Sequence, residues 1–389
     1  MRRFGSVVPL RLGSVSFPLG ASATLDELSS NPHPLLARLR AAEPVSWVPV
    51  LNGWLVTRHD LALRVMRDAA TFTVDDPRFS TARVVGPSML SLDGAEHARH
   101  RDPFVPPFRP APVRDRFAGF VASVVAELID SFADGATELR SSFAGPLAVA
   151  VVADALGLTG ADAATVRSWY AAIVESVSSV TAGGSPTAAG ATAYAALGES
   201  VTRTLEAGDE HSVLVAAAAG LTEPEVVSNA AVLMFGGMDT TEAMITNLVR
   251  HLLLTPTPPA QLPNAIEESV RLEPAAAVID RYATGDVVLA DAPVRAGDLV
   301  VVSIAGANRD PALFAGPDVF DPGRANARLN LAFAQGPHFC LGARLARKEA
   351  ELAARTLFER LPGLRLDPAH EHEPRGLVFR RPPVLHVRW

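Results

Sequence analysis

Residues 333–347 read Phe-Ala-Gln-Gly-Pro-His-Phe-Cys-Leu-Gly-Ala-Arg-Leu-Ala-Arg and contain Cys340, the only cysteine of the chain. Small and turn-forming residues precede the sulfur, and a segment with helical character begins directly after it. Backbone N–H groups in the first turn of a helix stabilise an anion, so this placement predicts a cysteine with a lowered pKa. A lone cysteine is more often a small buried hydrophobic residue, and its neighbours must decide between these interpretations.

The neighbours of Cys340 favour a metal ligand. The run resembles the cysteine-ligand loop of the cytochrome P450 family, in which a thiolate binds haem iron and pushes electron density toward O–O cleavage. The matching positions are Phe333, Gly336, His338, Cys340 and Gly342. Ala334 stands where the family usually has its first glycine, which affects the local turn. The resemblance implies that Cys340 binds the iron of haem b and that Phe333, His338 and Gly342 help to hold the cofactor.

Residues 222–254 have the pattern of one long helix. Thr222 and Glu225 are spaced as a capping box, and Pro224 falls in the first turn, where its missing N–H does no harm. At 1.5 Å per residue this helix would be on the order of 50 Å long and cross a whole domain.

Two glycines interrupt this helix at Gly236 and Gly237, and each costs about 1 kcal/mol relative to alanine. Packing against another helix is the ordinary reason, and close approach of a flat cofactor is the alternative. With Asp239 and Thr240 the glycines resemble the oxygen-activation motif of the P450 family. The resemblance implies that the glycines leave room for dioxygen, that Asp239 relays protons and that Thr240 donates a hydrogen bond. The Thr240 hydroxyl can also bond to the carbonyl one turn earlier.

A Glu-x-x-Arg pair lies on one helix face at Glu268 and Arg271. Such pairs are ordinarily exposed and contribute little to stability. The run 320–324, which ends in Arg324, resembles the second arginine element of the P450 family. The resemblance implies a buried network of these three side chains that fixes the segment before the cysteine loop.

Haem carries two propionates, which need cationic or donor partners. His97 and Arg101 lie at i and i+4 in a run that resembles the propionate-binding helix of the family. Arg281 and His338 are further propionate partners by resemblance. Arg99 and His100 on the same helix are interpreted as surface residues.

Composition fits a large, mostly helical protein. The chain has 389 residues, of which 48% are hydrophobic, and a net charge of −7 with no basic tract that suggests nucleic acid. We expect a single haem domain over residues 1–389, mostly α with a minor β part, with the long helix over the haem. Residues 1–34 are expected to be an N-terminal extension without a membrane anchor, because the apolar run is short and interrupted. A cytoplasmic monomer is expected.

Shorter elements frame this core. Helices are expected at 35–42 and 60–68, and strands at 45–50 and 54–57 around the hairpin signal Asn52-Gly53. Strands are also expected at 286–289 and 299–303, and the alternation in 377–389 predicts a C-terminal hairpin.

Substrate contacts are predicted from position along the chain, and most are apolar, which favours a small, largely hydrophobic organic molecule. The candidates are Phe72, Phe79, Met89, Leu90, Phe235, Ala276, Val278 and Phe379. Alternatively, an arginine anchors a carboxylate of the substrate, and the candidates for that role are Arg78, Arg83 and Arg380.

The resemblance implies a haem-thiolate monooxygenase that uses O₂ and NAD(P)H for hydroxylation, O-dealkylation or epoxidation. Members that use peroxide directly lack the Asp239–Thr240 pair. Arg344, Arg347 and Lys348 form a local basic cluster after Cys340, which predicts docking of an acidic ferredoxin supplied with electrons by its reductase. The alternatives are an oxidative coupling reaction on the same scaffold and a non-catalytic haem gas sensor.

Overall fold

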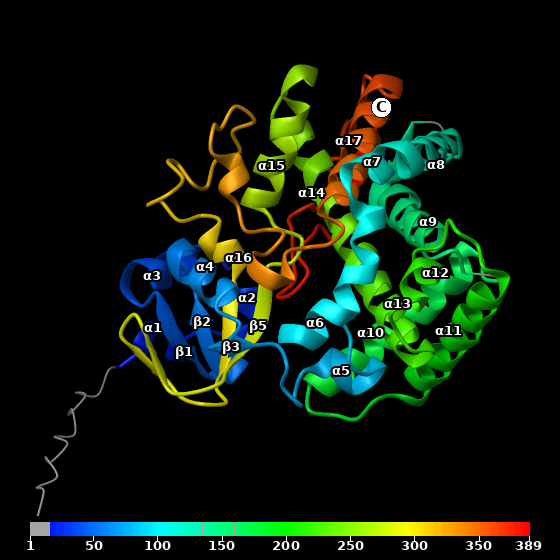
Figure 1. Cartoon of the computed structure of the whole chain (residues 1–389). Helices are drawn as coiled ribbons and strands as arrows, with labels where there is room; N and C mark the ends of the chain where they lie inside the picture. Colours follow the sequence, from blue (N-terminus) through cyan, green and yellow to red (C-terminus); the bar gives the residue numbers. More distant parts are fainter. Residues whose placement is uncertain (1–15, 134, 159) are drawn as a thin grey trace, which may run out of the picture.

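The computed structural model describes residues 16–133, 135–158 and 160–389. Most of the protein is helical, with a smaller sheet-containing part formed by the N-terminal segment and by strands from the second half of the chain (Figure 1). This confirms the predicted fold class. The first 15 residues of the predicted N-terminal extension lie outside the described residues. In the described residues, no helix has both the length and the apolar character needed to cross a bilayer.

The helices are α1 Pro18–Ala21, α2 Leu25–Ser29, α3 His33–Ala42, α4 His59–Arg67, α5 Ser80–Val85, α6 Gly94–Arg101, α7 Pro110–Pro112, α8 Ala118–Asp130, α9 Gly145–Leu156, α10 Ala163–Thr181, α11 Ala188–Ala207, α12 Val213–Ala218, α13 Glu223–Gly237, α14 Asp239–Leu254, α15 Leu262–Leu272, α16 Ile304–Ala307 and α17 Ala343–Arg360. The strands are β1 Val45–Val48, β2 Gly53–Val56, β3 Phe72–Thr73, β4 Ala136–Glu138, β5 Val278–Ala283, β6 Val287–Leu289, β7 Ala292–Val294, β8 Leu299–Ser303, β9 Arg365–Leu366 and β10 His386–Arg388.

The main sheet has the order β1-β2-β8-β5-β3, so it joins segments that are far apart in the sequence. The predicted hairpin of β1 and β2 is confirmed, with Val45 opposite Val56. Asn52 turns the chain in the left-handed conformation, with φ of 48°, which asparagine tolerates better than most residues. The parallel pairing of β2 with β8 then places the second half of the chain against the first.

The predicted long helix is present as two helices, α13 and α14, separated at Met238. Glu225 accepts a hydrogen bond from the backbone N–H of Thr222 at 2.8 Å, as expected for a capping box. The break lies where the Thr240 hydroxyl donates to the Gly236 carbonyl and competes for the acceptor of the regular helical bond. Helix α14 packs against α9, α15 and α17, which makes it a central element of the helical part.

The predicted Glu–Arg–Arg network is present and buried. Glu268 binds Arg271 through two hydrogen bonds of 2.7 and 2.8 Å, and it accepts a third of 2.9 Å from Arg324. Glu268 and Arg271 are fully buried, and Arg324 is 8% exposed. The two guanidinium groups also donate to the carbonyls of residues 308, 315, 316, 317 and 319. The network therefore fixes the irregular segment that leads to the cysteine loop.

The predicted C-terminal hairpin is wrong. Strand β10 pairs with β4 and β9, and residues 377–385 form no ladder with it. Phe379 instead makes an isolated bridge with Ala276, and Arg381 makes one with Arg375. Apolar and polar residues do alternate in this segment, but alternate side chains contact different parts of the protein instead of a second strand.

Replacing Glu268 with alanine should leave two buried guanidinium groups without their carboxylate. We expect a loss of roughly 3–5 kcal/mol in the free energy of unfolding, together with failure to retain haem. Denaturant unfolding and the haem content of the purified protein measure both effects. Glu96→Ala is the matched control, because Glu96 and Arg99 have the same i,i+3 spacing but form their ion pair on the exposed surface. A haem-loaded Glu268→Ala protein as stable as the control would contradict the structural role.

Candidate active site around Cys340

The Cys340 loop is closed by its own backbone. The N–H of Cys340 donates to the carbonyl of Phe333 at 2.8 Å, and that of Phe339 donates to Gly336 at 3.1 Å. Helix α17 begins three residues after the cysteine, at Ala343. The guanidinium group of Arg347, one turn into this helix, lies 4.0 Å from the centre of the Phe333 ring. Loop and helix therefore form one unit that presents the sulfur.

Two residues of the loop have left-handed backbone conformations. Gly336 has φ of 75°, and a Cβ there would lie 2.5 Å from the backbone oxygen of Met66 in α4, so only glycine fits. Ala334 has φ of 56°, a conformation that costs an L-residue roughly 1–2 kcal/mol. The alanine that departs from the family pattern thus occupies a position suited to glycine, and the loop keeps its shape at this cost.

The prediction of a lowered cysteine pKa is wrong for the protein without a metal. Burial raises the pKa of the Cys340 thiol and outweighs the backbone N–H groups of Gly342 and Ala343, which lower it. The predicted donors are present, but the burial of the sulfur outweighs them. A metal cation removes this obstacle, because a thiol that coordinates a metal loses its proton.

Three donors near the loop fit the propionates of haem. His97 is 5% exposed, and no acceptor among the described residues meets its buried Nε2. Arg281 is also 5% exposed, and it donates to the carbonyl of Asp280 but forms no ion pair within the described part of the chain. Arg101 binds the carbonyl of Phe339. Unpaired buried donors are costly, so this cluster fits an anionic group that completes it.

Burial depresses the pKa of both buried groups of this cluster. The pKa of His97 is lowered to about 4, first by burial and then by His338 and Arg101, while burial lowers that of Arg281 to about 10. His97 is therefore neutral at pH 7 in the protein without haem, and its ring N–H would donate to a propionate without adding a positive charge.

His338 is positioned by a carboxylate that the sequence did not reveal. Its Nε2 lies 2.8 Å from Asp93, which also accepts from Thr73 and from the N–H of Val74. The His338 and His97 rings are 4.3 Å apart. Although burial opposes it, hydrogen bonding to His338, Thr73 and Val74 lowers the pKa of Asp93 to about 2. Asp93 therefore sets the orientation of the histidine beside the cysteine.

The two glycines of the central helix have different surroundings. A Cβ on Gly236 would meet nothing within 4 Å, which is the open space predicted beside a flat cofactor. A Cβ on Gly237 would lie 2.5 Å from Val152 Cγ2 on α9. The interpretation of Gly237 as room for dioxygen is therefore replaced by helix packing, and only Gly236 keeps the predicted geometry. Thr240 hydrogen-bonds to the Gly236 carbonyl, as expected.

Asp239 is held by two side chains from distant elements. The Tyr170 hydroxyl on α10 donates to one carboxylate oxygen at 2.8 Å, and Arg381 donates to the other at 3.1 Å. Neither partner was predicted. A buried tyrosine hydroxyl needs an acceptor, so a partner for Tyr170 could be expected. Nothing in the sequence indicated that this acceptor is Asp239.

Some of the predicted substrate residues meet near the central helix. The Phe235 and Phe379 rings are 5.7 Å apart, and Ala276 bridges to Phe379 through the backbone. Met89 is tied to α13 by a 2.9 Å hydrogen bond from its N–H to Asn229, and Leu90 follows it. Phe79 precedes α5 and is half-buried.

The other predicted contacts have partners elsewhere in the protein, and their role toward a substrate stays a prediction except for Arg380. Phe72 is fully buried between the sheet and α4, and Val278 packs on the N-terminal cluster that includes Leu28. Arg380 is 2% exposed and bound to the buried Glu273 at 2.7 Å, so it cannot anchor a substrate carboxylate. Arg78 is an exposed partner of Asp76.

Three further predictions concern Arg83, Arg99 and His100. Arg83 is exposed, so its predicted role stays untested. Arg99 pairs with Glu96 and Glu225 on the surface, as expected. The surface interpretation of His100 is wrong, because this side chain is 2% exposed and its Nδ1 lies 3.0 Å from Nδ2 of Asn229. His100 and Asn229 thus connect α6 with α13 and with the loop at Met89.

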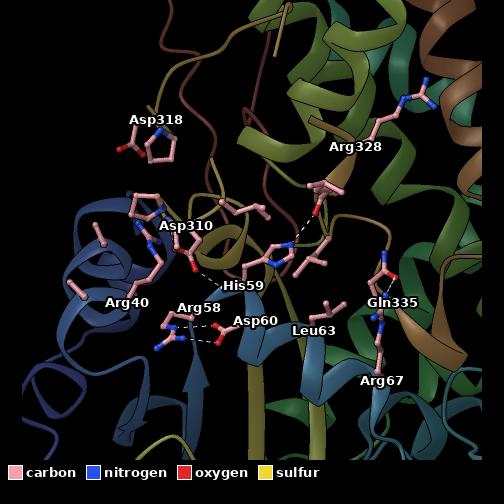
Figure 2. Close-up of a pocket in the computed structure, with 18 residues that line it drawn as sticks. Arg40, Arg58, His59, Asp60, Leu63, Arg67, Asp310, Asp318, Arg328 and Gln335 are labelled. Carbon is pink, nitrogen blue, oxygen red and sulfur yellow. Dashed lines mark hydrogen bonds and ion pairs between the residues drawn. The ribbon is translucent and has the colours of Figure 1, made fainter. Parts of the chain in front are cut away.

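A cavity of about 910 Å³ lies elsewhere, between α3, α4 and residues 310–335 (Figure 2). Its charged side chains are largely satisfied, as in the pair of Arg58 with Asp60 and the contact of Arg67 with Gln335. Neither Cys340 nor Asp239 lines it. We therefore assign no part of the reaction to this cavity.

Comparisons with known proteins agree with this geometry. The sequence model of the family described as Cytochrome P450 matches residues 261–382. Nocardicin C N-oxygenase of Nocardia uniformis subsp. tsuyamanensis is 34% identical over 97% of this chain and 100% of its own. The chain belongs to the cytochrome P450 family.

Two further P450s support this assignment. Mycinamicin IV hydroxylase/epoxidase of Micromonospora griseorubida is 34% identical over 90% of this chain and 94% of its own. The crystal structure of P450BioI, in complex with an acyl carrier protein ligated to hexadec-9Z-enoic acid, matches with a TM-score of 0.83 and 27% identity, covering 94% of this chain and 100% of that one. This protein is accordingly a haem b-dependent cytochrome P450 monooxygenase, not a gas sensor.

Replacing His97 with phenylalanine should keep a ring beside His338 and remove the unpaired Nε2. We expect haem affinity to fall roughly 10- to 100-fold, the loss of one hydrogen bond to a charged acceptor. Transfer of haem to an excess of apomyoglobin measures this. Arg99→Gln, on the same helix but directed at Glu225, should retain haem like the wild type. Equal retention by His97→Phe would show that His97 does not hold the cofactor.

Proposed function

We propose that this P450 oxidises a small, largely apolar product of secondary metabolism, with electrons from a ferredoxin and its reductase. The whole chain acts as one haem domain in the cytoplasm, where those donors are available. The proposal draws on relatives whose names specify N-oxygenation and hydroxylation or epoxidation. The aromatic pair Phe235 and Phe379 beside the acid–alcohol site favours an apolar substrate.

The arrangement of α13 and α14 supports oxygen chemistry more than any other observation. Bound haem supplies dioxygen activation at iron held by Cys340. Gly236 leaves space, Thr240 places its hydroxyl at the helix break, and Asp239 holds a carboxylate next to it. In this proposal Asp239 transfers protons inward from solvent and the Thr240 hydroxyl passes them on by hydrogen bonding.

Electron transfer requires a docking surface near Cys340. Of the three predicted cations, Arg347 pairs with Glu267 and Lys348 pairs with Glu351. Arg344 is exposed and has no ion pair in the described residues. Phe339, directly before the cysteine, is 41% exposed. We therefore place the ferredoxin contact at Arg344 and Phe339 and not on the whole cluster.

Reconstitution tests the proposed function. The haem-loaded enzyme, NADPH, a bacterial ferredoxin and its reductase are combined with mycinamicin IV or nocardicin C under isotopically labelled dioxygen. The expected product carries one labelled oxygen atom. A coupled product without labelled oxygen would instead support the oxidative coupling alternative.

Thr240→Ala should uncouple reduction from oxidation. Without the hydroxyl, we expect the product formed per NAD(P)H to fall roughly tenfold or more, with peroxide released instead, because a proton-transfer step is impaired. Product and peroxide are measured in the same reaction. Thr246→Ala is the matched control, because Thr246 makes the same backward hydrogen bond on α14, to Glu242. Unchanged coupling in Thr240→Ala would count against the role of Thr240.

Arg344→Gln should slow reduction by ferredoxin at low salt by roughly tenfold, because electrostatic steering depends on unpaired charge. The difference from wild type should shrink as salt is added. Stopped-flow reduction at several salt concentrations measures it, and Lys348→Gln, whose charge is already paired, should have a smaller effect. Salt-independent reduction of the wild type would refute docking at this surface.

A further inference from the structure

Arg381 is the side chain that joins the C-terminal segment to the acid of α14. Its Nη2 donates to Asp239 at 3.1 Å, and its Nε lies 2.8 Å from Glu242 Oε1. Arg381 is 15% exposed, Asp239 20% and Glu242 11%. Ion pairs that are this well shielded hold their geometry better than surface pairs do.

The segment matches the helix in spacing. Phe379 contacts Phe235 on α13, and Arg381 contacts Asp239 at the start of α14. Two residues along an extended chain advance about 6.6 Å, and four residues along a helix advance about 6 Å. Alternate side chains of the segment therefore meet successive turns along the α13–α14 axis.

Arg380, between them, makes the segment rigid. Its side chain points the other way, binds Glu273 at 2.7 Å and donates to the carbonyls of Ser29, Gly376 and Pro374. Its N–H donates to the carbonyl of Ala275 at 2.9 Å. With Arg380 fixed in the core, the position of Arg381 is set by the fold.

We propose that Arg381 is a positioning residue that fixes the carboxylate of Asp239 for proton transfer. Tyr170 binds one oxygen and Arg381 binds the other, so the carboxylate of Asp239 is fixed in one orientation. Glu242, held in turn by Arg140, prevents Arg381 from swinging outward. This role rests on the proposed function of Asp239 as the proton relay.

The test compares Arg381→Gln with Arg375→Gln. Arg375 lies in the same segment and bridges Arg381 through the backbone, but its side chain pairs with the exposed Glu371. With the substrate that the reconstitution identifies, we expect R381Q to lower product per NADPH roughly tenfold with KM unchanged, because only the chemical step uses the interaction. R375Q should behave as wild type. Arg381→Lys keeps the positive charge but not the planar guanidinium group with its several donors. It should recover part of the product formed per NADPH.

A second readout does not depend on turnover. In unfolding experiments, the combined R381Q and D239N substitutions should lower the midpoint by less than the sum of the single effects, because both remove one interaction. If R381Q does not load haem, R381K carries the turnover comparison, with a smaller loss expected. The inference would be overturned if the two single effects on the unfolding midpoint were additive, or if R381Q formed as much product per NADPH as the wild type. Either result would leave the proposed function intact. A wild type that never couples NADPH to product would overturn the proposed function and this role with it.

Discussion

The buried carboxylate of Glu268 between Arg271 and Arg324 is the interaction on which the rest of the structure depends. Placing three charges in the interior is costly, and the cost is offset only because each charge meets several partners. Glu268 accepts from both arginines and from the N–H of Asp321, and the two guanidinium groups donate to the carbonyls of residues 308, 315, 316, 317 and 319, which belong to no regular ladder. The network therefore substitutes for secondary structure in the segment that leads to Cys340. A displacement there would move the sulfur.

Several unfavourable features gather around the Cys340 loop. Cys340 is a thiol whose pKa burial raises, Ala334 has a left-handed backbone, and His97 and Arg281 lack anionic partners. Each costs stability in the protein alone. Bound haem would relieve several of them together, since Cys340 would hold the iron as a thiolate and the propionates would accept hydrogen bonds from the unpaired donors. A ligand that binds only the folded state also adds its binding free energy to stability.

Sequence reasoning succeeded where function depends on local spacing. The cysteine loop, the i,i+3 pair at Glu268 and the capping box at Thr222 each need only neighbouring residues, so their geometry follows from the sequence. It failed where a neighbour from far along the chain decides. Gly237 is explained by Val152, and the C-terminal alternation reflects two partners instead of a hairpin.

The same limit applies to Asp239, the proposed proton relay. Asp239 was identified from its place beside Thr240, but its partners Tyr170 and Arg381 lie 69 and 142 residues away in sequence. His100 was interpreted as a surface residue because it lies in a charged run. Its burial depends on the packing of α6 against α13, which the sequence does not reveal. Phe72 belongs to the core because its side chain packs among those of α4 and the main sheet.

The central claim is that the sulfur of Cys340 binds haem iron. Reducing the purified haem-loaded protein under carbon monoxide and recording the difference spectrum tests it most directly. The account predicts an absorption maximum at the long-wavelength position that thiolate ligation gives. A maximum at the position typical of histidine ligation, or a protein that takes up no haem, would contradict it.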